Sequence, residues 1–323
     1  MNSGPEIPDF EDRLAEANEK IYQSPTEARG LLNSLLESVP ETQVELRARV
    51  TERLSIVERI LGNFDLATRL GATAVAGYET SQNQVGVSRA WVSLGNIHWS
   101  RGNLREALDF YRKAYTQRAK LSDHSATAGA LASMANIHAE LGQFDDARDE
   151  YEEVLTLAHR ANNKRIIART ENNLSECLLM MGHPGTALNH ARSALELCRK
   201  LGDRSEEPNV LINLGQILGK LRFSQEAGDR LAEAVQTSAA IGDRRAHAES
   251  LSLWAVQLRA QRAPSGEETP DDLEDQAYTE ATEIGAFGLQ STICDRAIKA
   301  AETAGNSARL RKYQKRKSSI PPA

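Results

Sequence analysis

The chain of 323 residues carries a net charge of −6 at pH 7, and only 5% of its residues are aromatic. Few aromatic residues and abundant alanine suit close helix–helix packing better than a sheet core. The three cysteines cannot all pair internally, no run approaches 18 apolar residues, and the first ten residues lack the basic and apolar regions of a signal peptide. We therefore predict a cytoplasmic protein without a membrane span.

The charge is unevenly distributed. No acidic residue follows Arg309, and the segment 309–317 contains six basic side chains, so the rest of the chain is strongly acidic. A nucleic-acid-binding domain needs a basic face on folded structure, and we predict no nucleic-acid binding on the body of this protein. The role of the basic segment is left open.

A spacing of 40 residues dominates the sequence. One short motif, of the form Gly62-Asn63-Phe64-Asp65-Leu66-Ala67, recurs with conservative changes. Its final alanine falls at Ala67, Ala107, Ala147, Ala187 and Ala227, and the last copy has lost its glycine. Self-similarity at a fixed period of this size is typical of a solenoid, in which each unit buries its apolar face against its neighbours.

The predicted elements begin after a disordered segment, residues 1–9. Residues 10–39 form a weak first helix pair, in which Ser24 is the cap and Pro25 the first helical residue. The strong repeats cover residues 42–244.

The third repeat shows the predicted helix pair. Its first helix is marked by apolar residues at helical spacing and ends at Gly102, which can adopt the left-handed conformation. A second helix follows, and Asn103 (or Asp65 one repeat earlier) is expected to cap it. The small residue at Ala107 predicts a close approach of the two helices. The marking residues are Ala90, Trp91, Leu94, Ile97, His98, Ala107, Phe110, Tyr111, Ala114 and Leu121.

The last part of the chain departs from the 40-residue period. A helix is predicted from about Ala246 to Gln261, followed by an insertion, residues 262–270, whose role is left open. Thr269 and Pro270 then predict a helix start. Residues 289–318 are expected to form a terminal cap, and 319–323 a disordered tail.

These units resemble tetratricopeptide repeats. The family pattern is matched in the third unit by Trp91, Leu94, Gly95, Gly102, Ala107, Tyr111 and Ala114, and in the fourth by Leu131, Met134, Ala135, Gly142, Ala147, Tyr151 and Val154. The period exceeds the usual ~34 residues, and this longer form is similar to the repeats of LGN, MalT-type and Rap-type regulators. The resemblance implies an all-α fold: one right-handed α-solenoid of about seven to eight antiparallel helix pairs over residues 10–318.

The sequence offers no grouping of residues typical of an active site. It contains no nucleophile with a base at a recognisable spacing, no glycine-rich phosphate loop and no zinc-binding spacing. His98 and His138 share one repeat position and are interpreted as packing residues. Cys177 and Cys198 fall at apolar helical positions, where cysteine behaves as a small buried side chain. We predict no enzyme, no metal and no cofactor.

A binding surface is predicted where the resemblance implies a concave groove, on the first helix of each pair. Asparagine can donate to and accept from a peptide backbone, arginine can bind a carboxylate with two hydrogen bonds, and Trp99 would be the anchor. The candidate residues are Arg49, Arg89, Asn96, Trp99, Asn136, Arg169, Asn172, Glu176, Asn209 and Gln216.

Two functions follow from this surface. The first is a non-enzymatic scaffold or adaptor whose groove binds a peptide or helix, in particular an acidic one, of a partner protein. The alternative is a sensory module of a signalling protein, Rap-like or MalT-like, that binds a small ligand or peptide and acts on a partner or an output domain. A homodimer through the end repeats is left open.

Overall fold

The protein is all-α. A computed structural model describes residues 9–261 and 269–321, and over those ranges it contains sixteen helices and no strand. The chain divides into two compact units, Met1–Asn162 and Asn163–Ala323, which we describe separately. None of the helices in the described ranges combines the length and apolarity needed to cross a bilayer.

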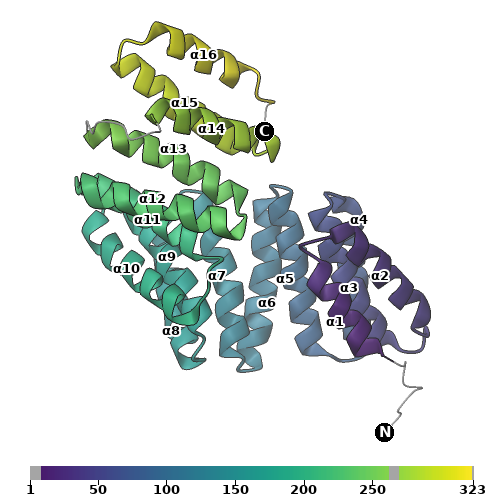
Figure 1. Cartoon of the computed structure of the whole chain (residues 1–323). Helices are drawn as coiled ribbons and strands as arrows, with labels where there is room; N and C mark the ends of the chain where they lie inside the picture. Colours follow the sequence, from purple (N-terminus) through teal and green to yellow (C-terminus); the bar gives the residue numbers. More distant parts are fainter. Residues whose placement is uncertain (1–8, 262–268, 322–323) are drawn as a thin grey trace. The chain divides into compact units, whose positions relative to one another are not determined.

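Each unit consists of four helix pairs, in which consecutive helices pack against each other (Figure 1). The helices of the first unit are α1 (Phe10–Lys20), α2 (Pro25–Ser38), α3 (Val44–Ile60), α4 (Phe64–Thr80), α5 (Gln84–Ser100), α6 (Leu104–Lys120), α7 (His124–Glu140) and α8 (Phe144–Arg160). Those of the second unit are α9 (Lys164–Met180), α10 (Pro184–Leu201), α11 (Glu207–Lys220), α12 (Ser224–Ile241), α13 (Arg244–Gln261), α14 (Pro270–Glu283), α15 (Phe287–Thr303) and α16 (Ser307–Ser318). The predicted α-helical pairs are confirmed; a single solenoid over residues 10–318 stays a prediction.

The turn inside each of the five pairs from α3 to α12 depends on a left-handed residue. Gly62, Gly102, Gly142 and Gly182 have φ between 75° and 84°, and a Cβ added at any of them would meet no atom within 4 Å. Backbone conformation, not space, therefore requires glycine here, as predicted. In the copy that lost its glycine, Arg222 keeps the same conformation with φ 66°, at a cost of about 1–2 kcal/mol for a residue with a side chain.

The caps predicted for the second helices are wrong. The side chain of Asn103 makes no capping hydrogen bond, and Asp65 instead forms an ion pair with Arg101. In the first unit, side-chain caps occur instead on first helices: Asn83 and Asp123 accept hydrogen bonds from the backbone N–H groups three residues later. The backbone differs between the two kinds of helix start: ψ is 69° at Asn103 but 85° at Asn83 and 81° at Asp123.

The small residues at the helix–helix contacts are buried as expected. All five alanines of the repeated motif have 0% of their surface exposed. Gly95 marks an even closer approach, because a Cβ there would lie 2.6 Å from the ring of Tyr111 on the paired helix. Interiors packed this tightly leave no room for an extra methyl group.

The first and last helix pairs also show local signals read from the sequence. Ser24 precedes α2 with Pro25 as its first residue, although the Ser24 side chain makes no capping bond. Thr269 caps α14 in a reciprocal arrangement with Asp272. Of the segments predicted to be disordered or inserted, residues 1–8, 262–268 and 322–323 lie outside the described ranges. Within the predicted tail, Ile320 packs against a cluster that contains Tyr313.

Candidate functional site

The candidate residues all lie on first helices. In the first unit α3 contacts α5, and in the second unit α9, α11, α13 and α15 contact one another in succession. No two second helices in the described ranges contact each other as extensively. First helices thus lie closer together than second helices within each unit, which is the arrangement expected on an inner face.

Arg49 and Arg89 of the first unit are held by carboxylates. Arg49 donates two hydrogen bonds, of 2.6 and 2.8 Å, to Glu11 of α1 and stacks on Phe10. The Nε atom of Arg89 lies 2.9 and 2.8 Å from the two carboxylate oxygens of Glu52, which is fully buried. Burial disfavours the charge of Arg89, but Glu52 outweighs it and the pKa of Arg89 is raised. These arginines are therefore already paired within the chain.

Asn96 and Asn136 occupy equivalent places one repeat apart. The Oδ1 atom of Asn96 accepts a hydrogen bond of 2.6 Å from the hydroxyl of Tyr111, and that of Asn136 accepts one of 2.7 Å from Tyr151. Each tyrosine comes from the second helix of the same pair. The hydroxyl group thereby fixes which end of the amide serves as acceptor.

Trp99 is half-buried near the end of α5. Its indole N–H donates a hydrogen bond of 2.7 Å to Glu140, the last residue of α7. The indole ring is thus oriented by a neighbouring first helix, and its polar atom is engaged.

The candidates of the second unit form a separate set. Arg169 lies 2.8 Å from a carboxylate oxygen of Glu206, and Asn172 accepts a hydrogen bond of 3.1 Å from Asn213. Asn209 is exposed and Gln216 is half-buried. Glu176 is exposed to solvent, yet the protein around it raises its pKa by desolvation, and Glu249 of α13 adds repulsion. Solvent reaches the Glu176 side chain, but neighbouring parts of the protein lie around it. This combination is expected for a residue on the inner face of a curved array.

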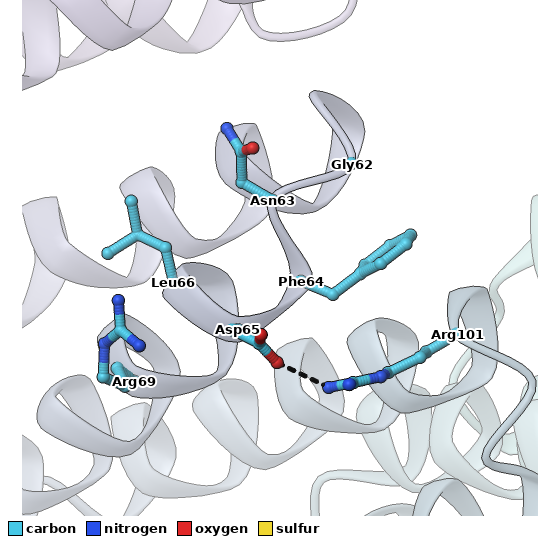
Figure 2. Close-up of a pocket in the computed structure, with 7 residues that line it drawn as sticks. All are labelled: Gly62, Asn63, Phe64, Asp65, Leu66, Arg69 and Arg101. Carbon is cyan, nitrogen blue, oxygen red and sulfur yellow. Dashed lines mark hydrogen bonds and ion pairs between the residues drawn. The ribbon is translucent and has the colours of Figure 1, made fainter.

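A surface depression of the first unit lies away from the candidate residues. Figure 2 shows this pocket of about 650 Å³ at the turn between α3 and α4, where Asp65 and Arg101 are 2.7 Å apart. Both side chains are largely exposed, so their ion pair contributes little. None of the candidate residues lines this pocket.

Sequence reasoning missed a set of histidine–carboxylate pairs that join the two helices of a repeat. His138 lies 2.7 Å from Glu150, and His190 lies 2.6 Å from Glu171. His98 stacks on Phe110 as a packing residue, and burial lowers its pKa. Burial also raises the pKa of Glu150. The sequence contained a signal for the His138 pair. Positions 98 and 110 correspond to positions 138 and 150 one repeat later, where Glu150 replaces the apolar Phe110.

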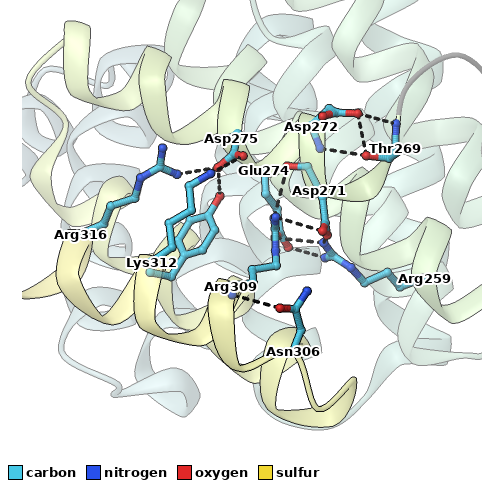
Figure 3. Close-up of polar contacts among 11 residues, drawn as sticks. Arg259, Thr269, Asp271, Asp272, Glu274, Asp275, Asn306, Arg309, Lys312 and Arg316 are labelled. Carbon is cyan, nitrogen blue, oxygen red and sulfur yellow. Dashed lines mark hydrogen bonds and ion pairs between the residues drawn. The ribbon is translucent and has the colours of Figure 1, made fainter.

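The basic segment 309–317 is part of a helix rather than a free tail (Figure 3). Arg309 lies 2.7 Å from Glu274, a fully buried residue of α14 that also binds Arg259. Asp275 accepts hydrogen bonds from Lys312, Tyr313 and Arg316, of 2.6, 2.8 and 2.6 Å. Acidic residues of α14 therefore hold α16 in place.

The three cysteines are buried, as predicted for Cys177 and Cys198. Burial raises the pKa of Cys198 and of Cys294 to about 11. At this pKa the thiolate is scarce at neutral pH, so these groups are poor nucleophiles.

With this geometry described, comparison with known proteins identifies the class. The family model of the tetratricopeptide repeat matches residues 86–158 and 126–200. The matched part of the chain, residues 86–200, therefore consists of tetratricopeptide-type repeats. No curated protein matches its sequence significantly.

Solved structures share the fold at low sequence identity. Aspartyl phosphate phosphatase F from Bacillus subtilis has a TM-score of 0.71 and 12% identity, over 99% of this chain and 96% of that one. The apo form of the quorum sensor NprR from B. thuringiensis has a TM-score of 0.71 and 11% identity, over 95% and 85%. A Rap protein solved as a complex with competence and sporulation factor has a TM-score of 0.65 and 15% identity, over 94% and 85%. Such identities establish the Rap-like fold and nothing further.

Proposed function

We propose that the protein is a non-enzymatic interaction scaffold whose first-helix faces bind a peptide or helix of a partner protein. The observation that supports this most is the repeated Asn–Tyr pair. At both Asn96 and Asn136, a buried tyrosine of the second helix engages the amide oxygen. Two amides are thus oriented in the same way, one repeat apart, on neighbouring first helices.

Fixed amides suit the recognition of an extended backbone. Because the oxygen of Asn96 accepts from Tyr111, its nitrogen is oriented to donate to a carbonyl of a bound peptide. Preorganised donors reduce the entropy lost on binding. Arg49, Arg89 and Trp99 complete the proposed surface of the first unit. Arg169, Asn172, Glu176, Asn209 and Gln216 form the proposed surface of the second unit. The ion pairs of these arginines imply that an acidic partner would compete with internal carboxylates.

The second candidate is a sensory module that acts on a partner or an output domain. The fold shared with the quorum sensor NprR and with a Rap protein bound to competence and sporulation factor favours this reading. The likeness to a protein named aspartyl phosphate phosphatase F is one of fold, and at 12% identity it transfers no activity. A cytoplasmic location and a homodimer through the end repeats stay predictions.

The test uses substitutions that keep the tyrosine bonded. In the double variant Asn96→Asp, Asn136→Asp, each carboxylate still accepts from its tyrosine but can no longer donate to a peptide. We expect a partner captured by the wild-type chain from a native lysate to bind this variant at least about tenfold more weakly, because hydrogen bonds to it are lost. The matched control is Asn189→Asp, at an exposed position on the second helix α10.

The two candidates give different results. Capture of a protein that the double variant loses and the control retains supports the scaffold. Equal capture by all three chains contradicts the use of the first-helix face. Failure of every chain to capture a protein, together with a rise in melting temperature when a low-molecular-mass extract is added, supports the sensor.

A further inference from the structure

A small cavity in the first unit lies between the N-terminal helix and the first helices of two repeats. Its volume is about 140 Å³, room for about four to five water molecules at ~30 Å³ each. It is lined by Glu11, Leu14, Ala15 and Asn18 of α1, Arg49 and Arg53 of α3, and Arg89 of α5. Three arginines thus converge on a space that fits one small polar group.

The charges around this cavity do not balance. Arg49 is paired with Glu11 and Arg89 with Glu52. Arg53 is half-buried and has no ion pair or hydrogen bond with any residue that the structure describes. Three guanidinium groups against two carboxylates leave one positive charge, so one monoanion would neutralise the site.

Asn18 adds an unfilled hydrogen bond. Its Oδ1 atom is buried and has no donor among the described residues. An unsatisfied buried acceptor costs about 1–3 kcal/mol, and a ligand that carries an N–H group would relieve that cost. The site therefore calls for a monoanion with an N–H group close to it. A peptide residue that carries a carboxylate has both.

We propose that this cavity, the Arg53 pocket, binds the carboxylate of a peptide residue, with Arg53 as its main contact and Asn18 accepting a neighbouring N–H. The proposal rests on the proposed function and adds the chemistry of one subsite. The chain's own Glu11 shows the fit, because a carboxylate is already bound to Arg49 with two hydrogen bonds at the edge of the pocket. A phosphate dianion would exceed the single uncompensated charge.

Glu11 also becomes a competitor. Its side chain is 70% exposed and binds Arg49 from the N-terminal helix, so a ligand carboxylate and Glu11 would share the guanidinium groups of the pocket. Removal of the Glu11 charge should therefore strengthen ligand binding, whereas removal of the Arg53 charge should weaken it.

The experiment follows side-chain NMR signals of the full chain during titration with N-acetyl-glutamate amide. We expect the Nε–H signals of Arg53 and Arg89 to shift and to saturate. N-acetyl-glutamine amide, which lacks the carboxylate, should produce no such change. N-acetyl-glutamine with a free C-terminal carboxylate separates the two sources: saturation with this compound alone assigns a C-terminal carboxylate, and saturation with the glutamate amide assigns an acidic side chain.

Four variants sharpen the result. Arg53→Gln should weaken binding of N-acetyl-glutamate amide at least about tenfold, as expected for a lost charged hydrogen bond, with Arg89 as the reporter. Arg105→Gln, exposed on the second helix α6, is its control. Glu11→Gln should tighten binding about two- to fivefold, the range of an exposed ion pair, and Glu16→Gln on the same helix should not.

Each contrary result is distinct. No saturable shift at Arg53 with either carboxylate overturns the proposal, as does tighter binding of inorganic phosphate than of N-acetyl-glutamate amide. Equal binding by the Arg53→Gln and wild-type chains also overturns it. The lysate experiment tests the proposed scaffold with variants of Asn96 and Asn136 and does not alter the Arg53 pocket. The proposed function and the Arg53 pocket can therefore be rejected independently.

Discussion

At the scale of single residues, glycine serves two separate purposes in this protein. Gly62 and its equivalents are needed for a left-handed turn, with no atom near the missing Cβ. Gly95 has ordinary helical geometry and is needed for space, because the ring of Tyr111 occupies the position of its Cβ. The same ring carries the hydroxyl that orients Asn96. The absence of a side chain at Gly95 therefore allows Tyr111 to lie where its hydroxyl orients the amide of Asn96 on the candidate surface.

The substitution Gly95→Ala should test the packing role. The added methyl group would lie 2.6 Å from the Tyr111 ring, and we expect a loss of about 1–3 kcal/mol in the free energy of unfolding. The control is Gly129→Ala on α7, where the added Cβ meets nothing within 4 Å; this change should stabilise the chain by about 0.5–1 kcal/mol. Urea denaturation measures both, and a similar effect of the two changes would refute the assigned packing.

At the scale of helices, α16 is docked by charge. Its only buried side chain is Tyr313, whereas Arg309, Lys312 and Arg316 all bind acids of α14. The rings of Tyr278 and Tyr313 lie beneath the guanidinium group of Arg316, at 4.5 and 4.9 Å. A terminal helix with so little apolar area depends on these contacts, and its docking should respond to pH.

Asp275 provides the test. Partial burial disfavours its charge, but hydrogen bonds from Lys312, Tyr313 and Arg316 outweigh this and lower its pKa to about 2, from an ordinary 3.8. Because the folded pKa lies below the unfolded one, the stabilisation is complete above about pH 4 and is lost as the pH falls toward 2. Hydrogen exchange of α16, corrected for intrinsic rates, should show opening over that window.

The variant Asp275→Asn should open more readily already at pH 7. We expect a loss of about 1.5 kcal/mol in the opening free energy of α16, at the lower end for charged hydrogen bonds because the Asp275 side chain is 33% exposed. Asp229→Asn, at an exposed position of α12, is the control. If α16 exchanges equally in both variants, charge does not dock this helix.

At the scale of the molecule, each unit is an array of helix pairs stabilised by neighbouring pairs. Consecutive helices within a pair share their apolar faces, so a cut between pairs should cost less than a cut through one. The buried faces of α7 and α8 contain Leu131, Met134 and Tyr151.

Truncation checks this. A fragment ending at Ser122 or at Asn162 ends between pairs, and we expect both to be monomeric and helical, with the longer one more stable. A fragment ending at Gly142 leaves α7 without α8 and should aggregate, or unfold at lower urea concentration than the shorter fragment ending at Ser122. Circular dichroism and size-exclusion chromatography measure the outcome. Stability that rises steadily through Ser122, Gly142 and Asn162 would contradict the pair as the folding unit.

The sequence by itself determined the helix pairs, their turns and their close contacts. These features depend on interactions that recur at a fixed spacing, such as the left-handed glycine at Gly102 and the small residue at Ala107, so one repeat explains the next. The same logic located the Asn96 and Asn136 row, although its tyrosine partners were read only as packing residues.

Only the tertiary structure decided which polar side chains are already engaged. Arg49 binds Glu11 of α1, and Arg309 binds Glu274 of α14. Both ion pairs join residues of helices that are not consecutive, and no repeated spacing in the sequence predicts them. Long side chains reach partners according to how helices cross, and the repeat period does not specify this. For the same reason the unpaired Arg53 and the orphaned oxygen of Asn18 became visible only when α1 was placed beside α3 and α5.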